Sequence, residues 1–279
     1  MRICSINTPE GAHLGLVTAR GVIDATAAGY PHDIDAVIAG AETESLTAIG
    51  RDAAQCVISA PEYLNVVGRP GKLLCVVLNY RSHAERVELK TAAVPILFSK
   101  YADALVPTGH DVALPPWEES YDYEAELVIV IGRRAWNVSR DAAGEYIFGY
   151  TCGNDLSCRA PQQRTSQWLI GKSMPGFGPC GPCIVTADEF DPEAGMRIKS
   201  YVNGALRQDG STADMIHTCK DIVSYASRYI ALEPGDLIFT GTPSGVMLEK
   251  SAAEQHWLRP GDRVDVEIEG IGTLTNYMV

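Results

Sequence analysis

The sequence has no apolar run long enough to cross a membrane. A spanning helix needs about 20 largely apolar residues, and no segment of the 279 residues approaches that length. The first residues, MRICSINTPEGAHLG, also lack the basic stretch and following apolar run of a secretory signal. We therefore expect a cytoplasmic protein with no membrane partner.

The sequence is also short of positive charge. Lysine and arginine number 23 against 35 acidic residues, which gives a formal net charge of -12. Such a chain repels phosphate backbones, so we expect no nucleic-acid partner. The eight cysteines are scattered rather than spaced as a disulfide framework, which fits a reducing compartment.

What is present is an ordinary globular composition. Hydrophobic residues make up 46% of the chain, enough for a large core without disulfides. The turn sequence Gly68-Arg69-Pro70-Gly71 precedes an apolar run at 73–78 that is typical of a buried strand. We place a boundary there, between a small N-terminal α/β domain at 1–68 and a main domain at 69–279.

Strand patterns dominate the second half of the chain. Pro-Gly turns at 234–235 and 260–261 each precede a strand pattern, and Asn203-Gly204 is a strong hairpin signal. Helical periodicity is clearest at 219–231, where Thr218 and Asp221 form a capping-box pattern. Many strands with few helices predict an α+β fold on a mixed, barrel-like or rolled sheet.

Two acidic residues fall on one face of a predicted strand. Glu124 and Glu126 lie in YDYEAELVIVIG, where residues i and i+2 point the same way. The apolar residues 127–131 predict burial, and buried carboxylates repel each other unless a cation neutralises them. The alternative is a strand end exposed to water, where neither needs a ligand.

A third oxygen ligand is available from Asp155, in the polar segment YTCGNDLSCRAPQ. Taken alone, this residue also fits a turn or a helix cap. Three carboxylates without nitrogen or sulfur ligands favour Mg²⁺ or Mn²⁺ over zinc.

Several segments, in this order, resemble the fumarylacetoacetate hydrolase family. They are LNYRSHA at 78–84, DYEAEL at 122–127, Asn154-Asp155 with Arg159 and Gln162, GKS at 171–173 and FTGTPSG at 239–245. The resemblance covers about residues 70 to 279. It implies a β-roll-like, usually dimeric catalytic domain with Mg²⁺ or Mn²⁺ on Glu124, Glu126 and Asp155.

The resemblance also implies roles for the substrate. In such enzymes a 2-oxo acid chelates the metal, which stabilises the enolate that forms as a bond breaks. Lys172 would stabilise the developing oxyanion, and a nearby cation would lower its pKa so that it could transfer a proton. Arg159, Gln162 and Thr242 would contact the substrate, although alone each is an ordinary surface or turn residue.

His83 is the expected general base that activates water. Hydrolases of this family pair this histidine with a glutamate, in many bacterial members three residues later, but here that position is Arg86. Other glutamates that could pair with His83 are Glu85, Glu88 and Glu249, and we favour Glu249, which follows the Thr242 turn.

Three hypotheses for function follow. The leading one is a metal-dependent hydrolase that cleaves a carbon-carbon bond in a 2,4-dioxo acid of the acylpyruvate or fumarylpyruvate type, in the breakdown of aromatic compounds. The second is a decarboxylase, tautomerase or isomerase of a 2-oxo acid such as oxaloacetate or a hydroxymuconate, which the Arg86 departure favours. The third is a catalytically silent binding protein on the same fold.

One motif competes with this interpretation. Cys180-Gly181-Pro182-Cys183 has thioredoxin-like spacing, but such a motif opens a helix. Here a strand pattern continues through 184–186, so we expect two buried cysteines without redox function.

Overall fold

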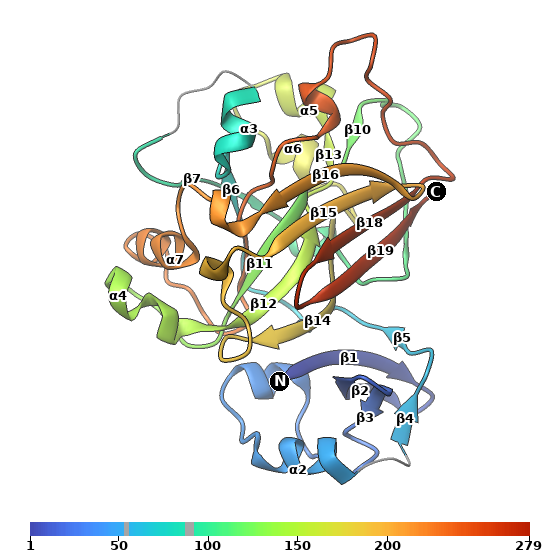
Figure 1. The fold of residues 1–279 in the computed structure, drawn as a ribbon, viewed down its shortest axis with the longest axis vertical. Coiled ribbons are helices and arrows are strands. Elements are labelled where there is room, and N and C mark those ends of the chain that lie inside the picture. Colours follow the sequence, from blue (N-terminus) through green and yellow to red (C-terminus); the bar gives the residue numbers. More distant parts are fainter. Residues whose placement is uncertain (53–55, 87–91) are drawn as a thin grey trace.

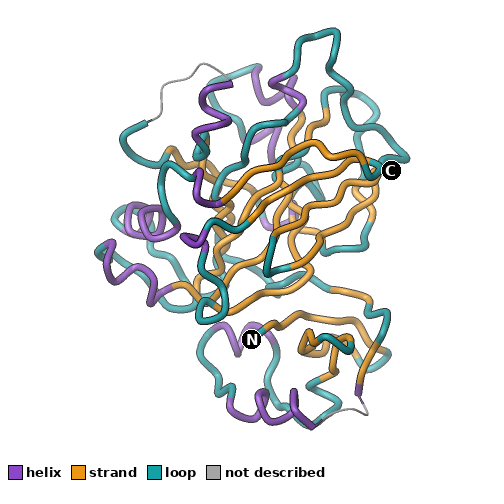
Figure 2. Tube along the Cα trace, viewed as in Figure 1, coloured by secondary structure: helices purple, strands orange, loops and turns teal. Residues whose placement is uncertain are grey.

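The computed structural model describes residues 1–52, 56–86 and 92–279, and strands form its centre (Figures 1 and 2). The largest sheet has twelve strands in a mixed arrangement. Its main path is β4 (Val57–Ile58), β3 (Gly21–Asp24), β2 (Gly11–Thr18), β1 (Arg2–Thr8), β14 (Gly178–Thr186), β12 (Ile147–Asn154), β11 (Ala125–Ile131), β17 (Leu237–Phe239), β6 (Leu73–Val77) and β7 (Ile96–Lys100). In addition, β5 (Glu62–Tyr63) pairs with β1 and β8 (Leu105–Val106) with β14.

A second sheet of five strands packs against the first. Its order is β16 (Ala205–Ser211), β15 (Arg197–Val202), β18 (Arg263–Ile268), β19 (Gly272–Met278) and β9 (Asp111–Val112). Between the sheets, Ile198 and Val266 share a buried cluster with Ile129 and Cys152. A two-stranded ribbon, β10 (Tyr121–Asp122) with β13 (Ser157–Cys158), lies beside them.

The helices are short and lie around the sheets (Figure 2). They are α1 (Ile34–Ile38), α2 (Glu44–Asp52), α3 (Arg81–Arg86), α4 (Arg140–Ala143), α5 (Arg159–Gln163), α6 (Leu169–Lys172) and α7 (Cys219–Ser227). Single 3₁₀ turns occur at η2 (Ala102–Ala104), η3 (Gly144–Tyr146), η4 (Pro192–Ala194), η5 (Thr212–Asp214) and η6 (Met247–Glu249). The predicted α+β class with a mixed sheet is confirmed. Within the described ranges the path of the large sheet has two ends, β4 and β7, so it does not close into a barrel.

The predicted helix cap and the predicted hairpin turn are both present in the structure. Thr218 and Asp221 form the predicted capping box at the start of α7, although the helix ends at Ser227 rather than near residue 231. Asn203 and Gly204 have positive φ angles of 52° and 79° and join β15 to β16, as a two-residue hairpin turn requires.

The first 68 residues form β1 to β5 with α1 and α2, seen at the bottom of Figure 1. They are joined to the rest of the chain by a sheet pairing, because β1 is antiparallel to β14 with Ile3 opposite Ile184. A buried cluster also includes Ile6 together with Cys183. The division at residue 68 stays a prediction.

Candidate active site

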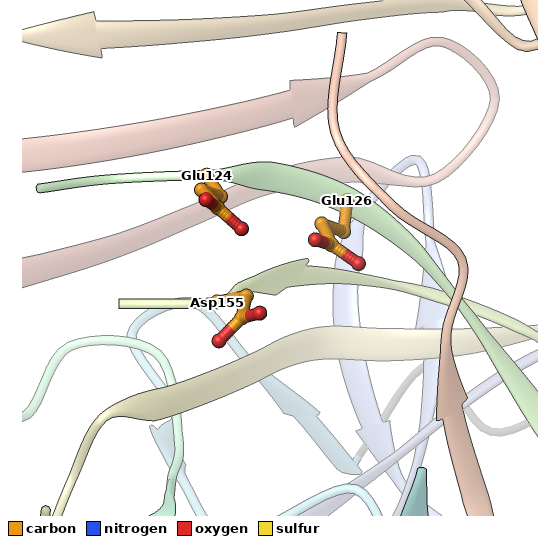
Figure 3. A group of neighbouring side chains, drawn as sticks. All are labelled: Glu124, Glu126 and Asp155. Atoms are coloured by element: carbon orange, nitrogen blue, oxygen red, sulfur yellow. The ribbon is translucent and has the colours of Figure 1, made fainter. Parts of the chain in front are cut away.

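The three predicted carboxylates meet where β11 begins and the neighbouring strand β12 ends. Glu126 lies in β11, whose seven residues are all buried, and Glu124 directly precedes this strand. The antiparallel register places Ala125 opposite Asn154, and the Asp155 amide donates to the Glu124 carbonyl at 2.9 Å. One carboxylate oxygen from each of Glu124, Glu126 and Asp155 lies within 4.8 Å of the others (Figure 3).

The charges of this buried carboxylate cluster are not fully compensated by neighbouring cations. Glu126 is 1% exposed, and burial followed by the charges of Asp155 and Glu124 raises its pKa well above the ordinary value. Burial also disfavours ionised Glu124, but Lys172 and Arg159 outweigh it and lower the pKa of Glu124. Two of the three carboxylates are therefore matched by cations, whereas Glu126 has excess negative charge around it.

Lys172 lies beside the cluster at the end of α6. Its Nζ donates to Glu124 Oε2 at 2.9 Å and to Asp155 Oδ2 at 2.8 Å. Burial opposes its charge, but Asp155 and Glu124 raise its pKa above the ordinary value. Lys172 is therefore an ammonium, the state that stabilises an oxyanion. Its use in proton transfer depends on a bound cation to lower the pKa and stays a prediction.

The sequence reasoning missed Lys100, a buried lysine at the end of β7. Its Nζ donates to the carbonyls of Leu156, Lys172 and Phe177, which occupies its three protons. The same Nζ lies 2.6 Å from Asp155 Oδ1, so this contact is an ion pair without a hydrogen bond. The signal in the sequence was weak, namely a lysine that ends the apolar pattern ILFSK.

The residues present fit a hard divalent cation. Asp155 Oδ1 is buried and accepts no hydrogen bond, its close contact being the ion pair with Lys100, so this oxygen keeps acceptor capacity for a cation. With Asp122, the cluster holds four acidic groups against the three bases Lys100, Lys172 and Arg159. A divalent cation on Glu124, Glu126 and Asp155 would turn this net negative charge into a net positive one, which suits an anionic substrate.

Arg159 and Gln162 lie on α5, next to the carboxylates. Arg159 donates through Nε to Asp122 at 2.9 Å, through Nη2 to Glu124 at 2.6 Å and through Nη1 to Gln162 Oε1 at 3.0 Å. Burial opposes the charge of Arg159, but Asp122 and Glu124 raise its pKa further. The guanidinium is therefore permanently charged and tightly held.

His83 lies on α3 and its ring pairs with Glu249. Nδ1 of His83 is hydrogen-bonded to Glu249 Oε1, while the Gly245 amide donates to Glu249 Oε2 at 2.6 Å. Glu85 and Arg86 are exposed, and Glu88 lies outside the described residues. Of the acids proposed for His83, Glu249 is therefore the one that the structure brings to it.

A cavity of about 220 Å³ joins these groups. All the predicted site residues except Glu249 line it: His83, Glu124, Glu126, Asp155, Arg159, Gln162, Lys172 and Thr242. Phe98, Trp168 and Leu248, which the sequence reasoning missed, form an apolar part of its wall. A larger cavity of about 970 Å³ is lined by residues around β5, β18 and β19 and contains none of these side chains.

Thr242 reaches the cavity with its hydroxyl already in use. The hydroxyl donates to the Ala125 carbonyl at 2.9 Å and accepts from Gln208 Nε2 at 2.7 Å. Because a substrate carboxylate needs a donor, direct contact would require this proton to leave the Ala125 carbonyl. The role of Thr242 in substrate binding stays a prediction.

Comparison with known proteins identifies the family of the chain. The family model described as Fumarylacetoacetate (FAA) hydrolase C-terminal matches residues 72–279. A human protein named oxaloacetate tautomerase FAHD2A, mitochondrial, is 34% identical over 290 residues, covering 100% of this chain and 92% of that protein.

Two solved structures are similar as well. The fumarylacetoacetate hydrolase from psychrophilic Exiguobacterium antarcticum has a TM-score of 0.88 at 34% identity, covering 100% of this chain and 99% of that one. The fumarylpyruvate hydrolase from Pseudomonas aeruginosa, in complex with Mn²⁺ and pyruvate, has a TM-score of 0.68 at 33% identity, covering 75% of this chain and 90% of that one.

The chain belongs to the fumarylacetoacetate hydrolase family. Its relatives include proteins named as hydrolases and as tautomerases. In the described part of the chain, no helix is long and apolar enough to cross a membrane. The competing cysteine motif lies in β14, where Cys180 and Cys183 are buried free cysteines, so the predicted strand at that position is confirmed.

Proposed function

We propose that this protein is a Mg²⁺- or Mn²⁺-dependent hydrolase of the carbon-carbon bond between C3 and C4 of a 2,4-dioxo acid of the acylpyruvate type. The observation that carries the proposal is a single cavity whose lining contains the carboxylate cluster, Lys172 and His83, and His83 is paired with Glu249. Water is consumed, and the products are pyruvate and the carboxylic acid of the acyl group.

Substrate binding follows from charge. Arg159 and Lys172 are cations in the wall of the metal-free cavity, because burial is outweighed by the neighbouring carboxylates, which raise the pKa of each, and they attract the substrate carboxylate. A bound Mg²⁺ or Mn²⁺ would supply Lewis-acid polarisation of the 2-oxo oxygen. Lys172 stabilises the negative charge that develops on that oxygen as the bond breaks. The apolar wall of Phe98, Trp168 and Leu248 receives the acyl group and excludes bulk water.

Water activation is assigned to His83. Because Nδ1 faces Glu249, this nitrogen carries the proton and Nε2 accepts one from water. The hydroxide adds to C4, the C3–C4 bond breaks, and its electron pair goes to C3. The proton taken by His83 then returns to C3, which becomes the methyl group of pyruvate.

Two findings support hydrolysis. Glu249 supplies the acid that the Arg86 position lacks, which removes the main argument against water activation. A similar structure is that of a protein named fumarylpyruvate hydrolase, with Mn²⁺ and pyruvate bound. Its two bound species match the cation and the product that we propose for this chain.

The second candidate is tautomerisation of oxaloacetate or a related 2-oxo acid. The observation that favours it is similarity along the whole chain to a protein named oxaloacetate tautomerase. That reaction moves a proton between C3 and the 2-oxo oxygen and consumes no water. It therefore needs Lys172 and the carboxylate cluster but no activated water on His83.

The deciding experiment measures both reactions on chelator-treated protein reloaded with Mg²⁺ or Mn²⁺. We expect pyruvate release from a panel of acylpyruvates only after metal is restored, and a roughly 10²- to 10⁴-fold loss in His83→Ala. Glu267→Gln is the control and should keep its activity, because Glu267 lies on β18 and lines the larger cavity, not the cavity of the candidate active site. No pyruvate from any acylpyruvate, together with oxaloacetate tautomerisation that His83→Ala retains, would replace hydrolysis by the second candidate.

The expected homodimer is part of the same proposal. Light scattering of the purified protein at micromolar concentration should give twice the chain mass of 30.1 kDa. A single species at the mass of one chain would contradict it.

A further inference from the structure

Asp122 is a fully buried carboxylate, at 0% exposure, that does not line the cavity. It accepts hydrogen bonds from groups of three separate segments. Oδ1 accepts from the amides of Tyr123 and Met247 at 2.9 Å each, and Oδ2 accepts from the Leu248 amide at 3.0 Å and from Arg159 Nε at 2.9 Å. Every strong acceptor position of this side chain is therefore in use.

One side of Asp122 supports the substrate-binding part of the cavity. Arg159 Nη2 also lies 2.8 Å from Asp122 Oδ2, so the guanidinium is shared between Asp122 and Glu124. The remaining Nη1 holds Gln162. Asp122 thus takes up part of the positive charge of Arg159 and fixes the plane of the guanidinium relative to the carboxylate cluster.

The other side of Asp122 supports the general-base pair. Met247 and Leu248 begin η6, the 3₁₀ turn that ends at Glu249, and their amides have no partner within the turn. Val246, which precedes this turn, provides no side-chain cap. Asp122, 125 residues away from Met247, supplies the missing acceptors. It therefore fixes the turn from which Glu249 reaches His83.

We propose that Asp122 is a positioning residue that holds Arg159 and the His83–Glu249 pair in fixed relation across the cavity. This inference rests on the proposed function for the roles of His83 and Arg159. Asp122 connects Arg159, which attracts the substrate carboxylate, with the pair that activates water for attack on C4, and small misplacements of such groups cost about 10²-fold in rate.

The test uses Asp122→Asn, which keeps the size of the side chain but replaces one acceptor oxygen by an amide NH₂. We expect kcat for acylpyruvate hydrolysis to fall about 10²-fold. In a Glu249→Gln background the same change should cost only about tenfold, because the pair that Asp122 positions is already disabled and only its contact with Arg159 is left to lose. Mn²⁺ affinity, measured by calorimetry without substrate, should weaken about tenfold, because Arg159 then binds Glu124 more strongly.

Asp236→Asn is the matched control. Asp236 is also 0% exposed and accepts from the amides of Lys72 and Glu233 at 2.8 Å each and from Lys72 Nζ at 2.9 Å, away from the cavity. The Asp236→Asn variant should have a lower thermal stability than the wild type but the same kcat and Mn²⁺ affinity. If Asp122→Asn behaves like Asp236→Asn, or if its effect on kcat adds fully to that of Glu249→Gln, Asp122 is structural only and the inference is overturned.

A second measurement needs neither turnover nor a folded Asp122 variant. Arg159→Lys and Glu249→Gln are combined, and the urea midpoints of the substrate-free proteins are compared. Because Asp122 binds both Arg159 and the turn that carries Glu249, the double variant should lose less stability than the two single losses together. Full additivity would overturn the inference even in an active enzyme. Absence of hydrolysis in the wild-type protein, with this coupling intact, would overturn the proposed function alone.

Discussion

Replacement of Glu126 by glutamine should affect metal binding and the stability of the metal-free fold in opposite directions. Glu126 Oε2 accepts from the Gly241 amide at 2.7 Å, and glutamine can keep an oxygen there. The raised pKa of Glu126 means that the metal-free folded protein holds its proton more tightly than the unfolded chain. Ionisation above the unfolded pKa of about 4.3 therefore costs stability, about 1.4 kcal/mol per pKa unit. Glu126→Gln removes this cost, so its metal-free Tm should equal or exceed that of the wild type.

Metal binding should show the opposite effect. An ion that binds the folded state at 100 times its Kd stabilises it by about 2.7 kcal/mol. With about 2 °C per kcal/mol for a chain of this length, the wild-type Tm should rise by about 5 °C. If the lost carboxylate weakens binding about 100-fold, the same metal concentration gives Glu126→Gln only about 0.4 kcal/mol, or about 1 °C.

The assay is thermal unfolding after chelator treatment, with and without Mn²⁺. Glu267→Gln makes the same chemical change in β18, outside the cavity of the candidate active site, and should keep the shift of about 5 °C. A Glu126→Gln protein that keeps the full Mn²⁺ shift would show that the ion does not use this carboxylate. A metal-free Tm several degrees below that of the wild type would refute the reasoning about excess charge.

Further predictions concern single contacts. Gly153→Ala should lower the free energy of unfolding by about 1–3 kcal/mol in urea titrations, because its Cβ would lie 2.6 Å from the Phe239 ring. Asp221→Asn should cost about 1 kcal/mol at pH 7. Burial opposes ionisation of Asp221, but hydrogen bonds from Thr218 lower its pKa, so stability is present above the unfolded pKa of about 3.9 and is lost as pH falls through the folded one. The difference between this variant and the wild type should therefore vanish in urea titrations at low pH. Lys172→Met should lower kcat about 10²- to 10³-fold in steady-state assays and lower the metal-free Tm, because two buried carboxylates lose their cation.

The sequence by itself determined the features that depend on neighbouring residues. Strand alternation put Glu124 and Glu126 on one face, the spacing of Thr218 and Asp221 predicted the cap of α7, and Asn203-Gly204 predicted a hairpin. The order of motifs identified the family. In the strand, the cap and the hairpin the responsible residues lie within four positions of one another, so the geometry of a single strand, helix end or turn fixes their relation.

Only the tertiary structure decided which distant residues complete the site. Glu249 reaches His83 across 166 positions, and Lys100 reaches Asp155 from the end of β7. Asp122 joins Arg159 to the turn that carries Glu249, although nothing in its local sequence distinguished it from its acidic neighbours. Such contacts depend on strand register and on how short helices pack around the sheet, and a buried charge finds its partner only when the whole fold has excluded water from it.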